Sequence, residues 1–246
     1  MKTISKTLLA AVLLAGPAFG ALPPPAGNDF LGVAYQELPL FPDELTRLGI
    51  REGEVRVVLS VDHLGNLEDA LVVSSTHPKF TEVTLNAFKK WRFTPLRQRG
   101  EPVAATTMVT VKFETRGAVV TSVTSHEIAM MLVAPLMRNA DAYRLHSLKE
   151  LDQIPTPIAA PAPAYPRELE AKGVTGEVTV GFYIDELGSV RIPSVDVSEN
   201  PVLASLAIEA LRQWRFEPPR SKGEPVLVKA SQVFKFGKNR LASGTR

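Results

Sequence analysis

The chain has 246 residues, of which 45% are hydrophobic and 22% are charged, and this composition excludes a wholly disordered protein. Its 28 basic and 26 acidic side chains nearly balance, and no stretch interleaves basic with aromatic residues, which argues against an electrostatic nucleic-acid binder. The absence of cysteine excludes disulfides, thiol chemistry and cysteine-based metal sites.

Residues 1–20 have the pattern of a secretory signal peptide. Two lysines precede the apolar stretch Leu8–Phe19, and residues 18–20 fit a cleavage site with small residues at its ends. The apolar stretch is shorter than the roughly 20 residues that a helix needs to cross a bilayer. We therefore expect cleavage before Ala21 and export to the periplasm. The alternative is an uncleaved N-terminus that anchors the chain in the inner membrane, facing the periplasm.

A sequence repeat dominates the rest of the chain. The stretch "KKWRFTPLRQRGEPV" at Lys89–Val103 returns as "RQWRFEPPRSKGEPV" at Arg212–Val226, 123 positions later. The same offset holds from Gly53 to Phe113, and upstream of Gly53 it becomes 124. A unit of about 75 residues is thus used twice. Two long copies indicate a tandem duplication rather than a solenoid, which needs at least three short repeats.

Each copy predicts the same series of elements. A short helix ends at a glycine and is followed by a strand in which apolar residues alternate with more polar ones. An Asp-x-x-Gly turn then leads into an antiparallel partner strand. In chain order, these three elements are expected at residues 43–48, 55–61 and 67–74 in the first copy, and at 167–171, 178–184 and 190–197 in the second.

A second helix with an apolar stripe follows in each copy, and the strands Val103–Phe113 and Val226–Phe236 close the two units. The pattern predicts an α+β protein with two tandem two-layer domains, each a three-stranded antiparallel sheet packed against helices. The aromatic residues of the Trp-x-Phe motif are expected in the core between helix and sheet: Trp91, Phe93, Trp214 and Phe216.

The predicted domain organisation has five parts: the signal peptide 1–20, a diverged first domain 36–114, a linker 115–160, a second domain 161–237 and a flexible tail 238–246. The linker contains a short helix that would begin at a capping box, Thr124–Glu127, with its apolar face at Ile128, Met131, Leu132 and Leu136. It also contains a proline-rich spacer, "LDQIPTPIAAPAPAYP", which we expect to be extended and to run into the second domain.

The motifs do not predict an enzyme. The four histidines do not recur between the copies, and "HEIAM" at His126 has Met130 where a zinc protease motif requires its second histidine. Neither a glycine-rich phosphate loop nor a Gly-x-Ser-x-Gly elbow is present. We expect no catalytic residue, no metal, no cofactor and no small-molecule substrate.

The order Tyr-Pro, glycine, Gly-Glu-Val-x-Val, Asp-x-x-Gly and Ala-x-x-x-Trp-x-Phe-x-Pro resembles the C-terminal domain of TonB-family energy transducers. Residues Tyr165–Phe236 carry the resemblance most closely, and the first copy has Phe41 in place of the tyrosine. The resemblance implies that such a domain binds a segment of an outer-membrane transport receptor as an added β-strand, close to the Tyr-Pro pair.

The partner-binding surface that the resemblance implies lies at the Tyr-Pro stretch and the last strand. In the second copy it comprises Pro163, Ala164, Tyr165 and Pro166 together with the last strand Val226–Phe236, in particular Val226 and Val228. In the first copy it comprises Pro39, Leu40, Phe41 and Pro42 together with Val103–Phe113. A glutamine often precedes the aromatic residue in the family, whereas this chain has Leu40 and Ala164. The alternative role of Tyr165 and Pro166 is to fix the entry of the following helix.

We therefore expect a periplasmic TonB-like protein that binds extended segments of outer-membrane receptors, or of other proteins, and takes part in TonB-type transmembrane transport. Two alternatives stay open. One is a membrane-anchored energy transducer with an uncleaved N-terminus. The other is a structural self-associating module, such as a homodimer, whose sheet edges pair with each other.

Overall fold

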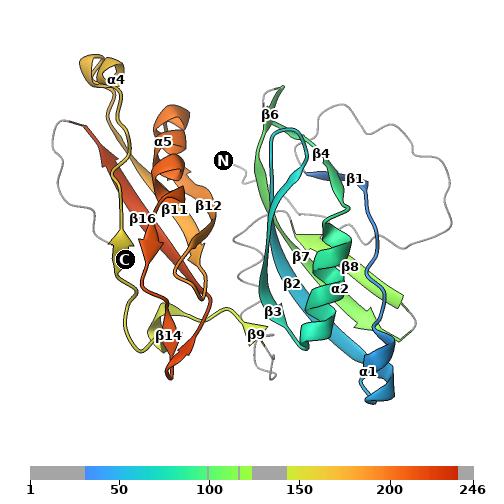
Figure 1. Ribbon diagram of the computed structural model, residues 1–246. Coiled ribbons are helices and arrows are strands. Elements are labelled where there is room, and N and C mark those ends of the chain that lie inside the picture. The colour runs from blue at the N-terminus through green and yellow to red at the C-terminus, as the bar shows by residue number, and fades with distance from the viewer. Residues whose placement is uncertain (1–30, 99, 116, 124–142, 238–246) are drawn as a thin grey trace, which may run out of the picture. The chain divides into compact units, whose positions relative to one another are not determined.

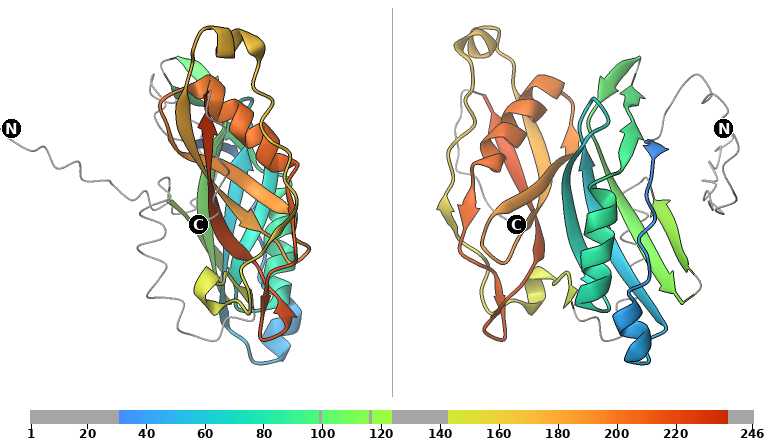
Figure 2. Two further views of the ribbon diagram at one scale, coloured as in Figure 1. Left: turned by 90° about the vertical axis from the view of Figure 1, so that its left-hand side faces the viewer. Right: turned by 45° about the vertical axis from the view of Figure 1, so that its right-hand side comes forward.

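The computed structural model describes residues 31–98, 100–115, 117–123 and 143–237. The chain divides into two compact units, an N-terminal unit that ends at Arg144 and a C-terminal unit that begins at Leu145 (Figure 1). Each unit has an antiparallel sheet with one longer helix lying on one of its faces (Figure 2). The predicted α+β class with two-layer domains is confirmed.

The N-terminal unit is built around a sheet with strand order β8-β7-β2-β3-β9. The short strands β1 and β4 pair with each other, as do β5 and β6. Its elements are β1 (Gly32–Tyr35), α1 (Asp43–Arg47), β2 (Glu52–Val61), β3 (Leu67–Ser75), α2 (Pro78–Phe88), β4 (Arg92–Thr94), β5 (Leu96–Gln98), β6 (Glu101–Val103), β7 (Ala105–Glu114), β8 (Gly117–Val123) and β9 (Tyr143–Arg144).

The C-terminal unit is built around a sheet with strand order β12-β11-β16. Short pairs again accompany it, β10 with β13 and β14 with β15. Its elements are the 3₁₀ helix η2 (Leu148–Glu150), β10 (Pro157–Ala159), α4 (Arg167–Ala171), β11 (Gly176–Ile184), β12 (Val190–Ser198), α5 (Pro201–Arg212), β13 (Arg215–Phe216), β14 (Arg220–Ser221), β15 (Glu224–Pro225) and β16 (Val228–Phe236).

The Asp-x-x-Gly turn of each copy is fastened to the strand that follows the long helix. In the C-terminal unit the Asp185 carboxylate accepts the backbone N–H groups of Leu187 and Ser189, at 3.0 and 2.8 Å. The N–H of Phe216 donates to the carbonyl oxygen of Gly188 at 2.8 Å. A Cβ on Gly188 would lie 2.0 Å from the carbonyl oxygen of Phe216, so only glycine permits this approach. The N-terminal unit repeats the arrangement with Asp62, Gly65 and Phe93.

The long helices begin where the sequence places an N-cap. The Asn200 side chain accepts the N–H groups of Val202 and Leu203, and Pro201 stands at the first helical position. In the N-terminal unit the His77 side chain has the capping role, accepting the N–H of Lys79. Each helix therefore has a fixed start from which its apolar stripe faces the sheet.

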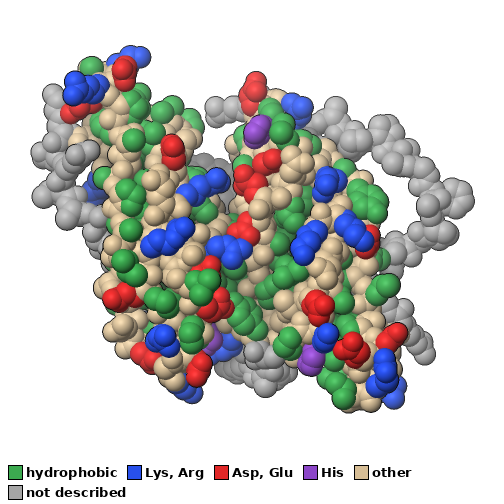
Figure 3. All heavy atoms as spheres, viewed as in Figure 1, with side chains coloured by type: hydrophobic (Ala, Val, Ile, Leu, Met, Phe, Trp, Pro, Cys, Tyr) green, Lys and Arg blue, Asp and Glu red, His purple; other side chains and the backbone are tan. Residues whose placement is uncertain are grey.

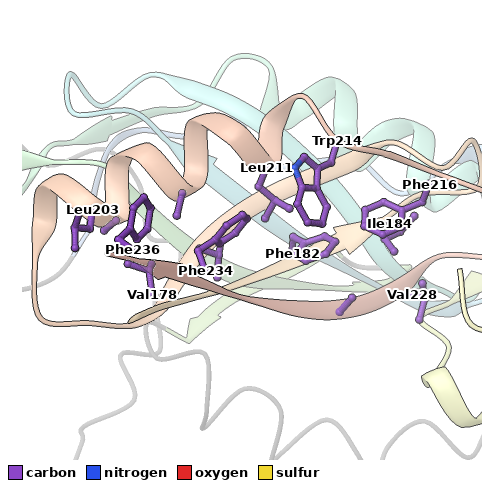
Figure 4. Packing of buried hydrophobic residues seen from close by; sticks show 14 residues of the cluster. Val178, Phe182, Ile184, Leu203, Leu211, Trp214, Phe216, Val228, Phe234 and Phe236 are labelled. Carbon is purple, nitrogen blue, oxygen red and sulfur yellow. The ribbon is translucent and has the colours of Figure 1, made fainter. Parts of the chain in front are cut away.

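A single aromatic and aliphatic core fills the space between helix and sheet in each unit. Figure 4 shows the C-terminal core, in which side chains of β11, β16 and α5 meet. Trp214 lies over Phe234 in an edge-to-face arrangement with ring centroids 5.6 Å apart. The four aromatic residues of the Trp-x-Phe motifs are all buried: Trp91, Phe93, Trp214 and Phe216.

The sheet of the N-terminal unit is wider than the predicted three strands. Residues 117–123, which the sequence analysis assigned to the linker, form β8 and pair with β7 from Met108 to Glu114. Residues 143 and 144 form β9 and pair with the end of β3 at Ser74 and Ser75. Residues 117–123 are part of the sheet and not of the linker. As an antiparallel strand, their backbone groups pair with those of β7, which would otherwise have no strand on that side.

The proline-rich spacer is also different from its prediction, because it is docked on the C-terminal unit. Pro157 and Ala159 pair with Phe216 and Arg215, forming the β10–β13 ladder. The N–H of Glu217 donates to the carbonyl oxygen of Thr156 at 2.9 Å. The spacer is extended as expected, but these bonds make it part of the domain, and we call residues 151–166 the leader segment.

Asp152 attaches the start of the leader segment to the β14–β15 hairpin. The two residues of the hairpin loop, Lys222 and Gly223, both have positive φ, as a type I′ turn requires. Their N–H groups donate to the two carboxylate oxygens of Asp152, each at 2.8 Å. These two bonds hold the pKa of the Asp152 carboxyl below its usual range, with the Gly223 amide contributing most.

Three predictions fall on residues outside the described part of the chain. These are the signal peptide 1–20, the linker helix around Ile128–Leu136 and the tail 238–246. Among the helices that the structure describes, none combines the length and apolar character of a membrane span.

The fastened turn predicts an unequal effect of two glycine substitutions. Gly173 has a φ of +64°, but its Cβ would meet nothing within 4 Å, so Gly173→Ala is a matched control for Gly188→Ala. We expect Gly173→Ala to lower the free energy of unfolding by about 1 kcal/mol. Gly188→Ala should lower it by about 3 kcal/mol or more, because a backbone carbonyl must move. Urea denaturation monitored by tryptophan fluorescence measures both, and equal losses would contradict the close approach.

The Asp152 attachment predicts a specific acid titration. Because the carboxyl has a lower pKa in the folded chain than in the unfolded one, the attachment stabilises the fold at neutral pH and is lost as the pH falls through the lowered value. In a series of NMR spectra, the amide resonances of Lys222 and Gly223 should titrate together with a midpoint below that of an ordinary aspartate. The variant Asp152→Asn should lack this titration, and its persistence would assign it to another group.

Candidate functional site

The three-stranded sheet of the C-terminal unit has two outer strands, and they differ in regularity. β16 pairs with β11 over nine consecutive residue pairs, from Gly176–Phe236 to Ile184–Val228, without a register shift. β12 pairs with β11 through two register shifts, contains Pro193 and has Ile192 at a φ of +44°. Bulges and proline make a sheet edge a poor template for another strand. The straight outer edge of β16 is therefore the better candidate for strand addition.

Most of the outer edge of β16 faces no strand in the part of the chain that the structure describes. On that side β16 has one bridge, between Val228 and His146, where the His146 N–H donates to the Leu227 carbonyl oxygen at 2.9 Å. From Ala230 to Phe236 the described strands add no further pairing on this side of β16. An outer strand of this kind offers a row of backbone N–H and C=O groups to an extended peptide.

The corresponding edge of the N-terminal unit is filled by the chain itself. β7 has β2 on one side and β8 on the other, over seven residue pairs (Figure 1, light green). The expectation that Val103–Phe113 offers an accessible edge is therefore wrong from Met108 to Phe113. The physical reason is that residues 117–123 fold back along this part of β7, with Gly117 opposite Glu114.

Tyr165 lies beside the far end of the open edge. Its ring packs against the core, with its centroid 5.7 Å from that of Phe236 at the end of β16. Its hydroxyl donates to the carbonyl oxygen of Val174, across α4. Pro166 is the N-cap residue of α4. The side chain of Tyr165 thus fixes the entry and exit of α4, while Ala164 and Pro166 remain exposed next to β16.

Phe41 takes the same place in the N-terminal unit. Its ring contacts Phe80 and Phe113 edge-to-face, with centroid separations of 5.4 and 6.5 Å. Pro39 is buried, whereas Leu40 is 80% exposed, and Pro42 is the N-cap residue of α1. Among Pro39, Leu40, Phe41 and Pro42, only the Leu40 side chain is exposed.

The structure separates the predicted contact residues of the C-terminal unit into two groups. Pro163–Pro166 lie near Phe236, while Val226 and Val228 lie at or before the opposite end of β16. At about 3.3 Å per residue, nine strand residues span about 30 Å. Val226 and Val228 are also buried, with exposed fractions of 8% and 0%. Their side chains are buried in the unit and are not available to contact a partner.

The tryptophans have a second role that the sequence analysis did not find. The indole N–H of Trp214 donates to the carbonyl oxygen of Pro161 at 3.0 Å, and that of Trp91 donates to the carbonyl oxygen of Glu37 at 2.9 Å. Glu37 and Pro161 are 124 residues apart, which is the upstream offset of the repeat. Because the tryptophans and their acceptors both recur at the repeat offsets, the sequence repeat could have predicted that the two tryptophans bind equivalent backbone positions. Each tryptophan thus holds the backbone that leads to the aromatic-proline pair.

A buried polar side chain lies on the candidate strand itself. Gln232 is 1% exposed, and its Nε2 donates to the carbonyl oxygen of Val233 at 2.8 Å. Its Oε1 is buried and accepts no hydrogen bond from the residues that the structure describes. A buried amide oxygen without a donor is unfavourable by about 1–3 kcal/mol. The repeat places Val109 at this position of β7.

The opposite face of the sheet carries a group of titratable side chains. Burial raises the pKa of Tyr183 to about 12, with a further contribution from the Asp196 charge. Burial lowers the pKa of Lys229, and Asp196 opposes this shift. Lys235 forms an exposed ion pair with Glu177 at 2.8 Å. These titratable side chains lie on the face of the sheet opposite the core. The outer side of β16 therefore offers mainly backbone hydrogen-bonding groups.

The charge pattern of the described surface is mixed. Figure 3 shows Lys and Arg side chains interspersed with Asp and Glu on the face in view of each unit. Within the described ranges, no group of three or more His, Asp or Glu side chains could hold a metal ion. The arrangement can hydrogen-bond an extended backbone, and it offers little for recognising a strongly charged ligand.

Comparison with known proteins gives one family. Residues 37–115 and 161–237 match the family model of the Gram-negative bacterial TonB protein C-terminal. Protein TonB of Pseudomonas aeruginosa is 36% identical to this chain over 83 residues, which are 32% of this chain and 24% of that protein. The chain thus spans about a quarter of the length of this curated relative.

A solved structure is similar over one such domain. The solution NMR structure of the Pseudomonas aeruginosa TonB CTD has 30% sequence identity, covers 40% of this chain and 98% of its own, and has a TM-score of 0.33. The two segments that match the family model make up more than half of the 246 residues. This chain therefore belongs to the family of Gram-negative bacterial TonB C-terminal domains, and carries two of them.

Proposed function

We propose that the C-terminal unit binds an extended segment of a partner protein, which adds as a strand along the outer edge of β16. The observation that carries this proposal is the contrast between two equivalent strands. β7 has a strand on both sides, whereas β16 runs straight for nine residues with a strand on one side among the described residues. An extended peptide can add to such an edge through main-chain hydrogen bonds.

The partner class that we propose is the periplasmic segments of outer-membrane transport receptors, or of similar proteins. Family membership supports a role in TonB-type transport across the outer membrane. The leader segment supports it further, because Trp214 and Tyr165 hold Pro163–Pro166 next to the end of β16. An incoming strand would then lie beside β16 with its end close to the exposed Ala164 and Pro166.

We propose that this activity is binding without catalysis, and that neither a cofactor nor a small-molecule substrate takes part. The main interactions would be backbone hydrogen bonds, each with a net contribution of about 0.5–1.5 kcal/mol. A segment of seven residues would therefore bind with modest affinity unless side chains add to it. Such affinity suits a partner that must be released again.

A titration of the full-length chain tests this proposal. The probes are synthetic peptides that copy periplasm-facing segments of outer-membrane transport receptors from the same cell. We expect shifts in the amide resonances of Ala230–Phe236 and slower exchange of the outward-facing amides there, because these amides gain acceptors. The control is the same peptide with alternate residues N-methylated, which keeps the side chains and removes the backbone donors. Equal binding of both peptides, or no binding at millimolar concentration, would contradict strand addition.

We further propose that residues 1–20 are removed on export and that the chain works in the periplasm. The mass of the natural N-terminus, measured after cell fractionation, tests this. A chain that begins at Ala21 in the soluble periplasmic fraction is the expected result. A chain that begins at Met1 in the inner-membrane fraction would instead favour an anchored energy transducer.

A further inference from the structure

We propose that residues 124–142 cover the face of the N-terminal sheet that lies opposite α2, and that they pack on it with an apolar stripe. The stripe consists of Ile128, Met131, Leu132 and Leu136. Residues 124–142 lie outside the described part of the chain, whereas the sheet that they would cover is described. The interaction is internal to the chain and is independent of the proposed strand addition at β16.

The face opposite α2 carries a group of buried apolar side chains. Val58 of the central strand β2 lies opposite Leu71 of β3 and Met108 of β7. Together with Val73, these side chains have exposed fractions between 1% and 7%. Their neighbours along the strands belong to the core under α2, and side chains alternate between the two faces of a strand, so this group points away from α2. Since α1 and α2 both contribute to that core, neither of them covers the group.

The second copy has small or polar residues at the same positions. The repeat offset of 123 converts Val58, Leu71, Val73 and Met108 to Gly181, Ser194, Asp196 and Ser231. The strand pairing supports this equivalence, because Gly181 lies opposite both Ser194 and Ser231. A Cβ on Gly181 would lie 2.7 Å from a carboxylate oxygen of Asp196, so a carboxylate takes the place of the apolar group. The apolar face is therefore specific to the first copy and requires a cover that only this copy has.

The path of the chain brings residues 124–142 to this face. The order β8-β7-β2-β3-β9 puts β8 and β9 at opposite edges of one sheet. β8 ends at Val123, opposite Met108, and β9 begins at Tyr143, opposite Ser75. Four spacings of about 4.8 Å separate the two outer strands, so the connection must cross about 19 Å. The core under α2 fills one face of the sheet, and the opposite face remains for the crossing.

The sequence of the connection fits this crossing. The run from Ile128 to Met137, IAMMLVAPLM, contains no charged or polar side chain. As a helix it would place the stripe along one side, and about 12 residues at about 1.5 Å per residue would span about 18 Å. The midpoint of the connection falls next to Leu132, and β2 is the middle strand of the sheet, so Leu132 would lie closest to Val58. The cover would add a third layer to the N-terminal unit alone.

Disulfide formation in the full-length chain tests the contact, because the chain has no natural cysteine. The variant Val58→Cys with Leu132→Cys should form an intramolecular disulfide under mild oxidation, detected by peptide mass mapping. The matched control is Val58→Cys with Met130→Cys. Met130 lies on the opposite side of the expected helix from the stripe, so its disulfide should form at least about tenfold more slowly.

The outcomes of this experiment decide the identity of the cover. A disulfide between two chains as the main product would assign the cover to a second copy and overturn the inference. Equal rates for the two cysteine pairs, or no disulfide with either, would contradict the proposed packing.

A matched pair of charge substitutions gives a second readout that leaves the sheet unchanged. Leu132→Glu would place a carboxylate against the apolar face, whereas Met130→Glu would place it on the other side of the helix. We expect Leu132→Glu to raise the amide exchange rates of β2 and β3 at least about tenfold above those of Met130→Glu, with β11 and β16 as an unchanged internal reference. Equal exchange of β2 and β3 in both variants would overturn the inference. Receptor-peptide binding at β16 should be the same in both variants, so the two proposals fail separately.

Discussion

The constraint on which this architecture depends is the hydrogen bonding of a small antiparallel sheet. A central strand satisfies its backbone groups on both sides, but the two strands beside it each leave an outer edge to be paired, blunted or exposed. β12 is blunted by Pro193 and register shifts, and β7 is paired with β8. β16 alone among these is straight and, in the described residues, mostly unpaired on its outer side. The two copies therefore differ in whether the outer side of their last strand has a neighbouring strand: β7 has β8, and β16 has none among the described residues.

The tryptophan of each copy connects the core to this edge. Its ring fills the space between helix and sheet, and its indole N–H fixes the backbone that leads to Tyr165 or Phe41. The ring of Tyr165 then meets Phe236, so the leader segment is positioned over the end of β16 by contacts that begin in the core. The core and the edge of β16 are thus physically connected, so a change in the packing around Trp214 would also move the leader segment.

The sequence predicted the elements that depend on local patterns. Alternating apolar residues, Asp-x-x-Gly turns and the Asn200-Pro201 cap gave the hairpins and helices of both copies. It did not predict β8, β9 or the docking of the leader segment, since their partners are distant and their composition reads as linker. The assignment of Val226 and Val228 to the contact surface missed their burial, because an apolar residue in a last strand faces the core as readily as a ligand. Gln232 could have been noticed, since a glutamine replaces Val109 at a core-facing position of the repeat.

The occupied edge of β7 also limits how such chains could join one another. A molecule with two straight open edges could pair with a neighbour at each end and grow into a long assembly, as happens when an interface does not close on itself. By folding residues 117–123 onto its first copy, the chain moves the edge of that sheet from the ten-residue β7 to the seven-residue β8. Among the described strands, the two copies therefore end in unlike edges, and an assembly that joined identical edges end to end would lack the second matching surface.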